Sequence, residues 1–75
     1  MKSKIEYFVN GEVQHTEEDP ITVKRILEKA GFTPPDQYEL IRDKDQHKYK
    51  DLHKEVEIHN GERFTALFVG PTPTS

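Results

Sequence analysis

A single run of apolar side chains at helical spacing constrains the fold of this chain more than any other feature. Four of them recur at positions i, i+3, i+4 and i+7 and form one stripe: Val23, Ile26, Leu27 and Ala30. Thr22 stands directly before the stripe as an N-cap, whose hydroxyl can accept a hydrogen bond from the first turn. Gly31 stands directly after it, where a left-handed residue ends a helix. The pattern predicts one amphipathic helix with a single face to bury.

One helix with one apolar face can cover only one face of a sheet. The chain has 75 residues, which is enough for one domain. Hydrophobic residues make up 32% and charged residues 33%, so a folded core depends on the periodic placement of the apolar residues. We therefore predict the α+β class, with a mixed sheet of four to five strands and one helix packed on one face.

The first two strands are predicted to form a hairpin. Residues 4–9 are rich in β-branched and aromatic side chains, and Asn10-Gly11 follows, the pair that best tolerates positive φ at both centres of a type I′ turn. Residues 12–16 then return antiparallel. Three alternate residues of the first strand face the core in this arrangement: Ile5, Tyr7 and Val9. Glu6 and Phe8 face the other way.

The remaining strands follow the helix. Residues 33–36 contain two prolines and exclude a helix or a central strand. Residues 38–42 predict a strand with Tyr38 and Leu40 on one face and Ile41 on the other, and residues 46–50 a short edge strand. Residues 63–69 form the most strand-like segment. Its two faces are predicted to carry Phe64, Ala66 and Phe68 on one side and Thr65, Leu67 and Val69 on the other.

Charge and composition restrict the partners and the location. The net charge is −3 with mixed signs, so nucleic acid is not expected as a partner. No apolar run reaches the length of a membrane span, and the first residues do not resemble a signal peptide. The chain has no cysteine. We expect a cytoplasmic monomer that does not bind membranes.

The residue pattern does not indicate an enzyme. The four histidines lie at positions 15, 47, 53 and 59, without the spacing of metal ligands. No hydroxyl residue stands in an arrangement that would activate a nucleophile. We therefore predict no catalytic residue, no metal site and no cofactor.

Four short motifs, taken in order, resemble ubiquitin-like β-grasp domains, and most closely bacterial ones such as those of multi-ubiquitin-type proteins. They are V-N-G (9–11), I-L-E-K-A-G (26–31), Y-E-L-I-R (38–42) and R-F-T-A-L-F (63–68). The resemblance covers residues 4–70. It implies a β-grasp fold in which the first and last strands pair in parallel at the centre of the sheet. Residues 1–70 would form the ubiquitin-like domain and residues 71–75 a flexible tail or linker stub.

The resemblance implies a protein without enzymatic activity that acts as a protein modifier or as a docking module. An alternative is a sulfur carrier that is activated at a C-terminal glycine. A protein modifier and a sulfur carrier both react through a C-terminal glycine. Gly70 is the matching residue in this chain, although Pro71 follows it. The implied partners are proteins, including activating and conjugating enzymes or a peptidase.

The resemblance also places the main recognition surface of this class at Ile41 and Leu67. Val69 shares the parity of Leu67, and Phe8 would extend the same surface on the first strand. The alternatives are that these are ordinary scattered surface residues, or that the polar segment 43–54 covers them.

Overall fold

The computed structural model describes residues 4–70 and contains one α-helix and two sheets. The elements in chain order are β1 (Ile5–Val9), β2 (Glu12–Thr16), β3 (Ile21–Thr22), α1 (Val23–Lys29), the 3-10 helix η1 (Pro35–Gln37), β4 (Tyr38–Arg42), β5 (His47–Tyr49), β6 (Glu55–Val56) and β7 (Glu62–Phe68). Five strands form the main sheet in the order β2-β1-β7-β4-β5, and β3 pairs with β6 in a second, two-stranded sheet. The predicted α+β class and the five-stranded mixed sheet are confirmed.

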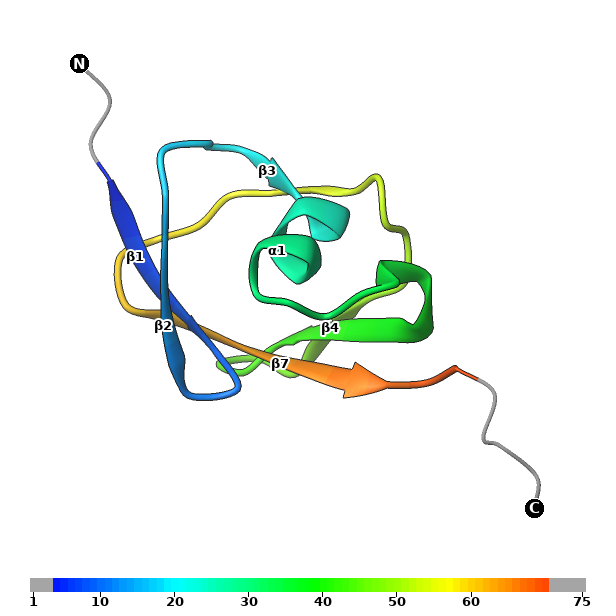
Figure 1. Ribbon diagram of the computed structural model, residues 1–75. Coiled ribbons are helices and arrows are strands. Elements are labelled where there is room, and N and C mark those ends of the chain that lie inside the picture. Colours follow the sequence, from blue (N-terminus) through cyan, green and yellow to red (C-terminus); the bar gives the residue numbers. More distant parts are fainter. Residues whose placement is uncertain (1–3, 71–75) are drawn as a thin grey trace.

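The first and last strands of the chain lie side by side in the middle of the sheet (Figure 1). They pair in parallel, from Tyr7 opposite Glu62 to Val9 opposite Phe64. On its other side β7 pairs antiparallel with β4, from Tyr38 opposite Phe68 to Arg42 opposite Phe64. β7 therefore joins the β1–β2 pair to the β4–β5 pair in a single sheet.

The hairpin and the helix ends form as their local sequences predict. Asn10 and Gly11 have φ of 52° and 80°, which is the conformation of a type I′ turn. Thr22 Oγ1 accepts a hydrogen bond from the Arg25 amide at 3.2 Å and caps α1. Gly31 has φ of 89°, and Phe32 N–H donates to the Leu27 carbonyl at 2.9 Å, which is the long bond of a Schellman motif.

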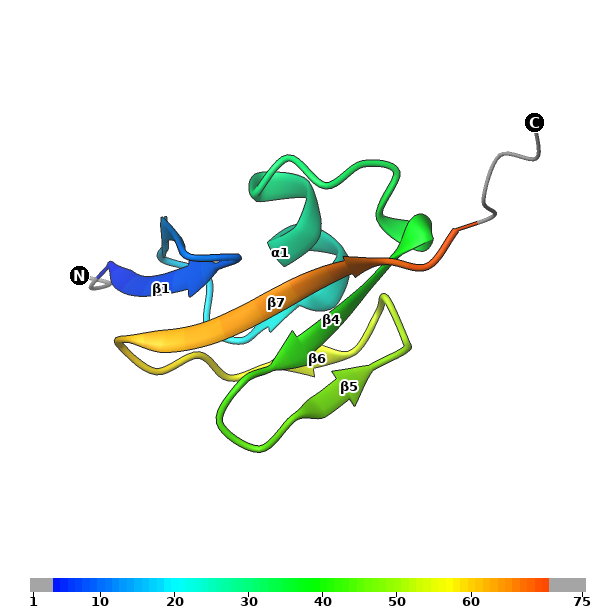
Figure 2. The same cartoon turned by 90° about the horizontal axis from the view of Figure 1, so that it is seen from below.

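The core lies between α1 and one face of the main sheet (Figure 2). The helix contributes Val23, Ile26 and Leu27, all fully buried. The main sheet contributes six buried apolar residues: Tyr7, Val9, Leu40, Tyr49, Phe64 and Ala66. The rings of Tyr7 and Phe64 meet edge to face, with centroids 6.1 Å apart. The predicted inward faces of the helix and of these strands are confirmed.

The segment between β5 and β7 closes the side of the core near the start of α1. Val56 and Ile58 are buried, and Leu52 packs against the core. The carbonyl groups of Lys54 and Leu52 accept the N–H groups of Val23 and Lys24 at 3.0 and 2.9 Å. These bonds satisfy donors that the first turn of a helix leaves unpaired. The β3–β6 pair, which holds this segment in place, was not predicted from the sequence.

Two predictions for individual segments were wrong or incomplete. Residues 33–36 were expected to exclude a helix, but Pro35 begins the short helix η1, because a proline fits the first position of a helical turn. Phe68 shares the parity of Phe64 but is 47% exposed, since it lies beyond the end of α1. Within residues 4–70, no helix has the length and apolar character needed to cross a membrane.

Candidate protein-binding surface

The outer face of the main sheet, defined here as the side turned away from α1, carries the residues that were predicted to bind partners. Successive side chains of a strand point to opposite faces, so Arg63, Thr65 and Leu67 of β7 point outward between the buried residues of the same strand. Ile41 lies opposite Thr65 on the neighbouring strand β4. The segment 50–61 packs on the helix side and leaves this face open (Figure 2).

Ile41 and Leu67 lie next to each other on this face. Ile41 is opposite Thr65, so Leu67, two residues further along β7, is its diagonal neighbour. Leu67 is 49% exposed and Ile41 is half-buried. Thr65 Oγ1 donates to Asp43 Oδ1 at 2.7 Å, which fixes the polar boundary of the pair. We call Ile41 and Leu67 the apolar patch.

Phe8 belongs to a different part of the outer face. It lies opposite Arg63 on one side and Val13 on the other. The Arg63 guanidinium covers the Phe8 ring at 4.6 Å from its centroid. Arg63 precedes Leu67 by four residues, or about 13 Å of strand. The structure therefore does not bring Phe8 into contact with the apolar patch.

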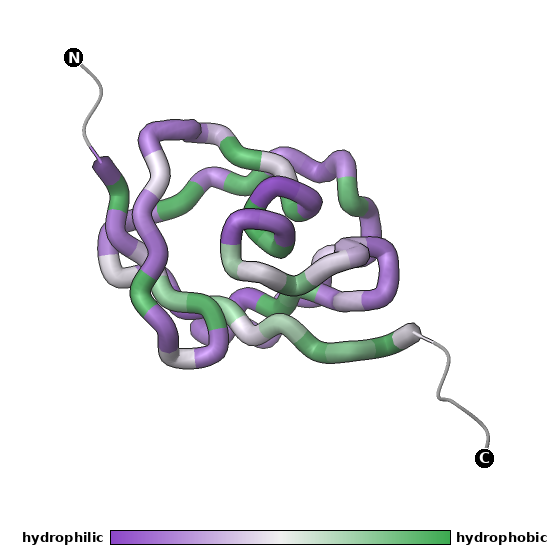
Figure 3. Tube along the Cα trace, viewed as in Figure 1, coloured by the Kyte–Doolittle hydropathy of each residue, from purple (hydrophilic) through white to green (hydrophobic). Residues whose placement is uncertain are grey.

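Val69 lies just beyond the end of β7, in a segment that carries apolar side chains on both faces of the sheet. Val69 is 53% exposed, and its N–H donates to the Gln37 carbonyl at 2.8 Å. The Phe68 ring rests against Tyr38 on the helix side, with centroids 5.5 Å apart. Figure 3 shows the end of β7 as a continuous hydrophobic stretch. Leu67, Phe68 and Val69 therefore extend the exposed apolar surface around the tip of the strand.

Gly70, the residue predicted for C-terminal processing, is fixed to the body of the domain. Its N–H donates to the same Gln37 carbonyl at 3.1 Å. A Cβ atom at this position would lie 2.9 Å from Cβ and Cγ of Gln37, closer than side chains pack. The close approach therefore requires a glycine. The predicted tail at 71–75 lies outside the described residues.

A buried carboxylate near the start of β7 was not predicted from the sequence. Glu62 is only 8% exposed, and one of its oxygens, Oε2, lies 3.4 Å from Lys44 Nζ. Its other oxygen, Oε1, is buried without a hydrogen-bond partner among the described residues. Glu62 has the parity of Phe64, and this was the signal that it would point inward.

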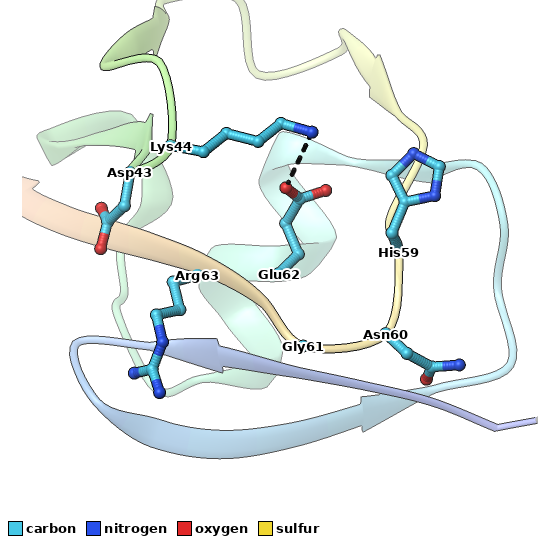
Figure 4. A pocket seen from close by; sticks show the side chains of 7 residues that line it. All are labelled: Asp43, Lys44, His59, Asn60, Gly61, Glu62 and Arg63. Carbon is cyan, nitrogen blue, oxygen red and sulfur yellow. Dashed lines mark ion pairs between the residues drawn. The ribbon is translucent and has the colours of Figure 1, made fainter.

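Glu62 lies in an open groove, whose lining alternates between acidic and basic side chains (Figure 4). The lining residues are Asp43, Lys44, His59, Asn60, Gly61, Glu62 and Arg63. Lys44 reaches over Glu62, whereas Arg63 points away from it. Because cations and carboxylates are balanced, the groove has no dominant charge that would select a ligand.

A strong exposed ion pair closes the turn between β4 and β5. Arg42 donates to both carboxylate oxygens of Asp45, at 3.0 and 2.6 Å. These hydrogen bonds, assisted by the backbone N–H of His47, lower the pKa of Asp45 from 3.8 to about 2. The pair orders the turn beside the outer face.

The described part of the chain offers little to coordinate a metal, and comparisons with known proteins add no relative. Among residues 4–70, no three or more His, Cys, Asp and Glu side chains are grouped so that they could hold a metal ion. No protein-family model, curated protein or solved structure matches the chain. The candidate site therefore stands on its geometry: an apolar patch on the outer face of the central strands.

Proposed function

We propose that this chain is a ubiquitin-like β-grasp domain without enzymatic activity, which acts in a bacterial cytoplasm by binding protein partners through the apolar patch. Two arrangements support the proposal of a β-grasp fold. The chain's first and last strands pair in parallel at the sheet centre, and one helix crosses a single sheet face. The single observation that carries the binding function is the exposure of Leu67, 49%, beside Ile41 on a sheet face that no element between residues 4 and 70 covers.

The geometry of Gly70 favours docking over conjugation. Activation of a modifier or of a sulfur carrier requires a glycine end that can enter a narrow channel. Gly70 is instead hydrogen-bonded to Gln37 and packed against its side chain. Pro71 follows it, and a proline nitrogen carries no N–H. A docking role requires neither the release of Gly70 nor the removal of the residues after it.

The size of the apolar patch indicates a weak, transient complex. Full burial of one leucine or isoleucine side chain contributes about 1.5–3 kcal/mol, and part of this is offset by the cost of association. Polar residues surround the patch: Glu39 lies opposite Leu67, and Lys48 lies opposite Ile41 on β5. A partner would therefore place an apolar anchor between these charges and pair with them at the rim.

The test compares two equally exposed apolar residues. Val13 on the edge strand β2 is 48% exposed and lies away from the apolar patch, so Val13→Asp is the matched control for Leu67→Asp. Immobilised wild-type and variant domains are incubated with a bacterial lysate, and each retained protein is then purified and titrated calorimetrically against all three domains. We expect partners that bind the wild type and Val13→Asp but not Leu67→Asp. Equal binding by the wild type and Leu67→Asp would contradict the proposal.

A further inference from the structure

Two Asn-Gly pairs stand at opposite ends of the β1–β7 ladder. Asn10-Gly11 forms the turn after β1, and Asn60-Gly61 directly precedes β7. Both glycines have positive φ, 80° at Gly11 and 83° at Gly61. In an Asn-Gly pair the backbone nitrogen of the glycine can attack the side-chain carbonyl carbon of the asparagine, because glycine has no side chain to obstruct the approach. Both pairs thus contain the groups required for a spontaneous cyclisation.

At Asn60 both reacting groups are bound to the backbone of one residue, Glu6. The Gly61 N–H, whose nitrogen would be the nucleophile, donates to the Glu6 carbonyl at 2.7 Å. The Glu6 N–H donates to Asn60 Oδ1 at 3.0 Å and holds the carboxamide in place. Cyclisation here requires the start of β7 to separate from β1, and the cyclic imide lacks the Gly61 N–H until water opens the ring.

At Asn10 only one of the two reacting groups, the side chain, is held; the Asn10 N–H, which takes no part in the reaction, donates to the Phe64 carbonyl at 3.0 Å. Asn10 Oδ1 accepts the Ala66 N–H at 2.9 Å, and Asn10 Nδ2 donates to the Ala66 carbonyl at 3.2 Å. We call these two bonds the Asn10 clamp. The Gly11 N–H has no acceptor within residues 4–70. Cyclisation here requires the Asn10 side chain to leave the clamp and the Asn10-Gly11 peptide to turn about the Asn10 Cα–C bond, because a type I′ turn holds the Gly11 nitrogen away from the side chain. Since the Gly11 N–H has no acceptor among these residues, this motion is confined to the turn and does not need β1 to separate from β7.

We propose that Asn10-Gly11 is a site of covalent modification in the folded protein, where Asn10 deamidates through a succinimide, and that the β1–β7 ladder protects Asn60-Gly61. The Gly11 nitrogen bonds to Asn10 Cγ, the bond between Cγ and Nδ2 breaks, and Nδ2 leaves as ammonia with the proton of the Gly11 amide. Water then opens the ring at either carbonyl and leaves aspartate or isoaspartate at position 10.

The modification would loosen the end of β7 that carries the apolar patch. An aspartate at position 10 can still accept the Ala66 N–H but has no N–H for the Ala66 carbonyl. An isoaspartate adds a methylene to the main chain of a two-residue turn, whose length fixes the register of β1 and β2. Because Leu67 directly follows Ala66, the loss of the Asn10 clamp reaches the proposed binding surface.

The test measures deamidation at both positions in the same sample of the intact domain. Wild-type protein is incubated under mildly alkaline conditions, and peptide mapping by mass spectrometry quantifies aspartate and isoaspartate at positions 10 and 60. Synthetic peptides that cover residues 7–14 and 57–64 give the unprotected rates. We expect the ratio of peptide rate to protein rate to be larger at Asn60 by about tenfold or more, because strand separation is a larger opening than a rearrangement within a two-residue turn. Equal ratios, or a larger ratio at Asn10, would overturn the proposal.

Denaturant and a matched pair of variants assign the difference to the structure. In urea that unfolds the domain, both sites should reach their peptide rates; a difference that survives unfolding would refute protection by the ladder. Asn10→Gln and Asn60→Gln each replace one site by an amide whose cyclisation needs a larger, slower-forming ring. In the folded protein Asn10→Gln should abolish most ammonia release, and Asn60→Gln should leave it almost unchanged. The reverse pattern would assign the reaction to Asn60 and contradict the proposal.

Discussion

The two faces of β7 differ in what covers them, although both carry apolar residues. On the inner face Phe64 is 1% and Ala66 8% exposed, because α1 packs over them. On the outer face Leu67 is 49% exposed, and no element within residues 4–70 lies over it. One strand therefore stabilises the core with one face and leaves apolar side chains exposed on the other. The position of the helix, rather than hydropathy along the strand, decides which face is buried.

The largest effect is expected from emptying the inner face. Phe64→Ala removes a fully buried ring that packs against Tyr7, and we expect the free energy of unfolding to fall by about 3–5 kcal/mol. A domain of this size has little more than that in total, so most of the variant should be unfolded in water. Urea unfolding followed by circular dichroism measures the change. A loss no greater than that of Leu67→Ala would contradict the assignment of the two faces.

The Asn10 clamp joins the hairpin turn to β7 and is expected to have the second largest effect. Asn10→Ala removes two hydrogen bonds to Ala66 and puts alanine, which adopts a left-handed backbone less readily than asparagine, at φ of 52°, so we expect a loss of about 2 kcal/mol. Asn10→Gly tolerates the same φ and removes only the bonds. Urea unfolding of both variants separates the two contributions. An unchanged stability of Asn10→Gly would show that the clamp contributes nothing.

Charge on the outer face should cost little stability. Leu67→Asp places a carboxylate where the side chain is already half in water, and we expect the free energy of unfolding to change by less than about 0.5 kcal/mol. Urea unfolding of Leu67→Asp beside Val13→Asp measures it. A loss comparable to that of Phe64→Ala would mean that Leu67 is a core residue and that no apolar patch exists.

The smallest effect is expected at the rim, from the ion pair between Arg42 and Asp45. The pKa of Asp45 is depressed in the folded state to about 2 from 3.8, so its stabilising contribution is present above 3.8 and is lost as the pH falls through about 2. Thermal unfolding of the wild type should therefore lose stability over this window, and Asp45→Asn should flatten that part of the profile. Parallel profiles would show that the pair does not act on stability.

Local signals in the sequence predicted the elements whose ends are set by nearby residues. Thr22 and Gly31 define the limits of α1, and Asn10-Gly11 defines the hairpin, because each acts on backbone groups within a few residues. The parallel pairing of β1 with β7 followed only from the resemblance, since no local pattern specifies which distant strands meet. The alternating patterns of β4 and β7 placed Ile41 and Leu67 on the outward faces of their strands without indicating how much of each is exposed.

The features that were missed all depend on residues far apart in the chain. Asn10 was read as a turn residue, but its side chain also binds Ala66, 56 positions away. The β3–β6 pair has two residues on each strand, too few for a periodic pattern. Glu62 was not recognised as buried, because its position beneath Lys44 depends on how the β4–β5 turn folds over the start of β7. Phe68 has inward parity but lies past the end of the helix that would cover it.

The parallel pairing of β1 with β7 has a mechanical consequence. Tension applied through Lys4 and Gly70 pulls the two adjacent strands in opposite directions along their own axes. The hydrogen bonds between them then bear the load together in shear, instead of opening one after another as they would in a hairpin pulled apart at its ends. A domain built in this way should hold its fold under stretching forces that would unzip the β1–β2 hairpin alone.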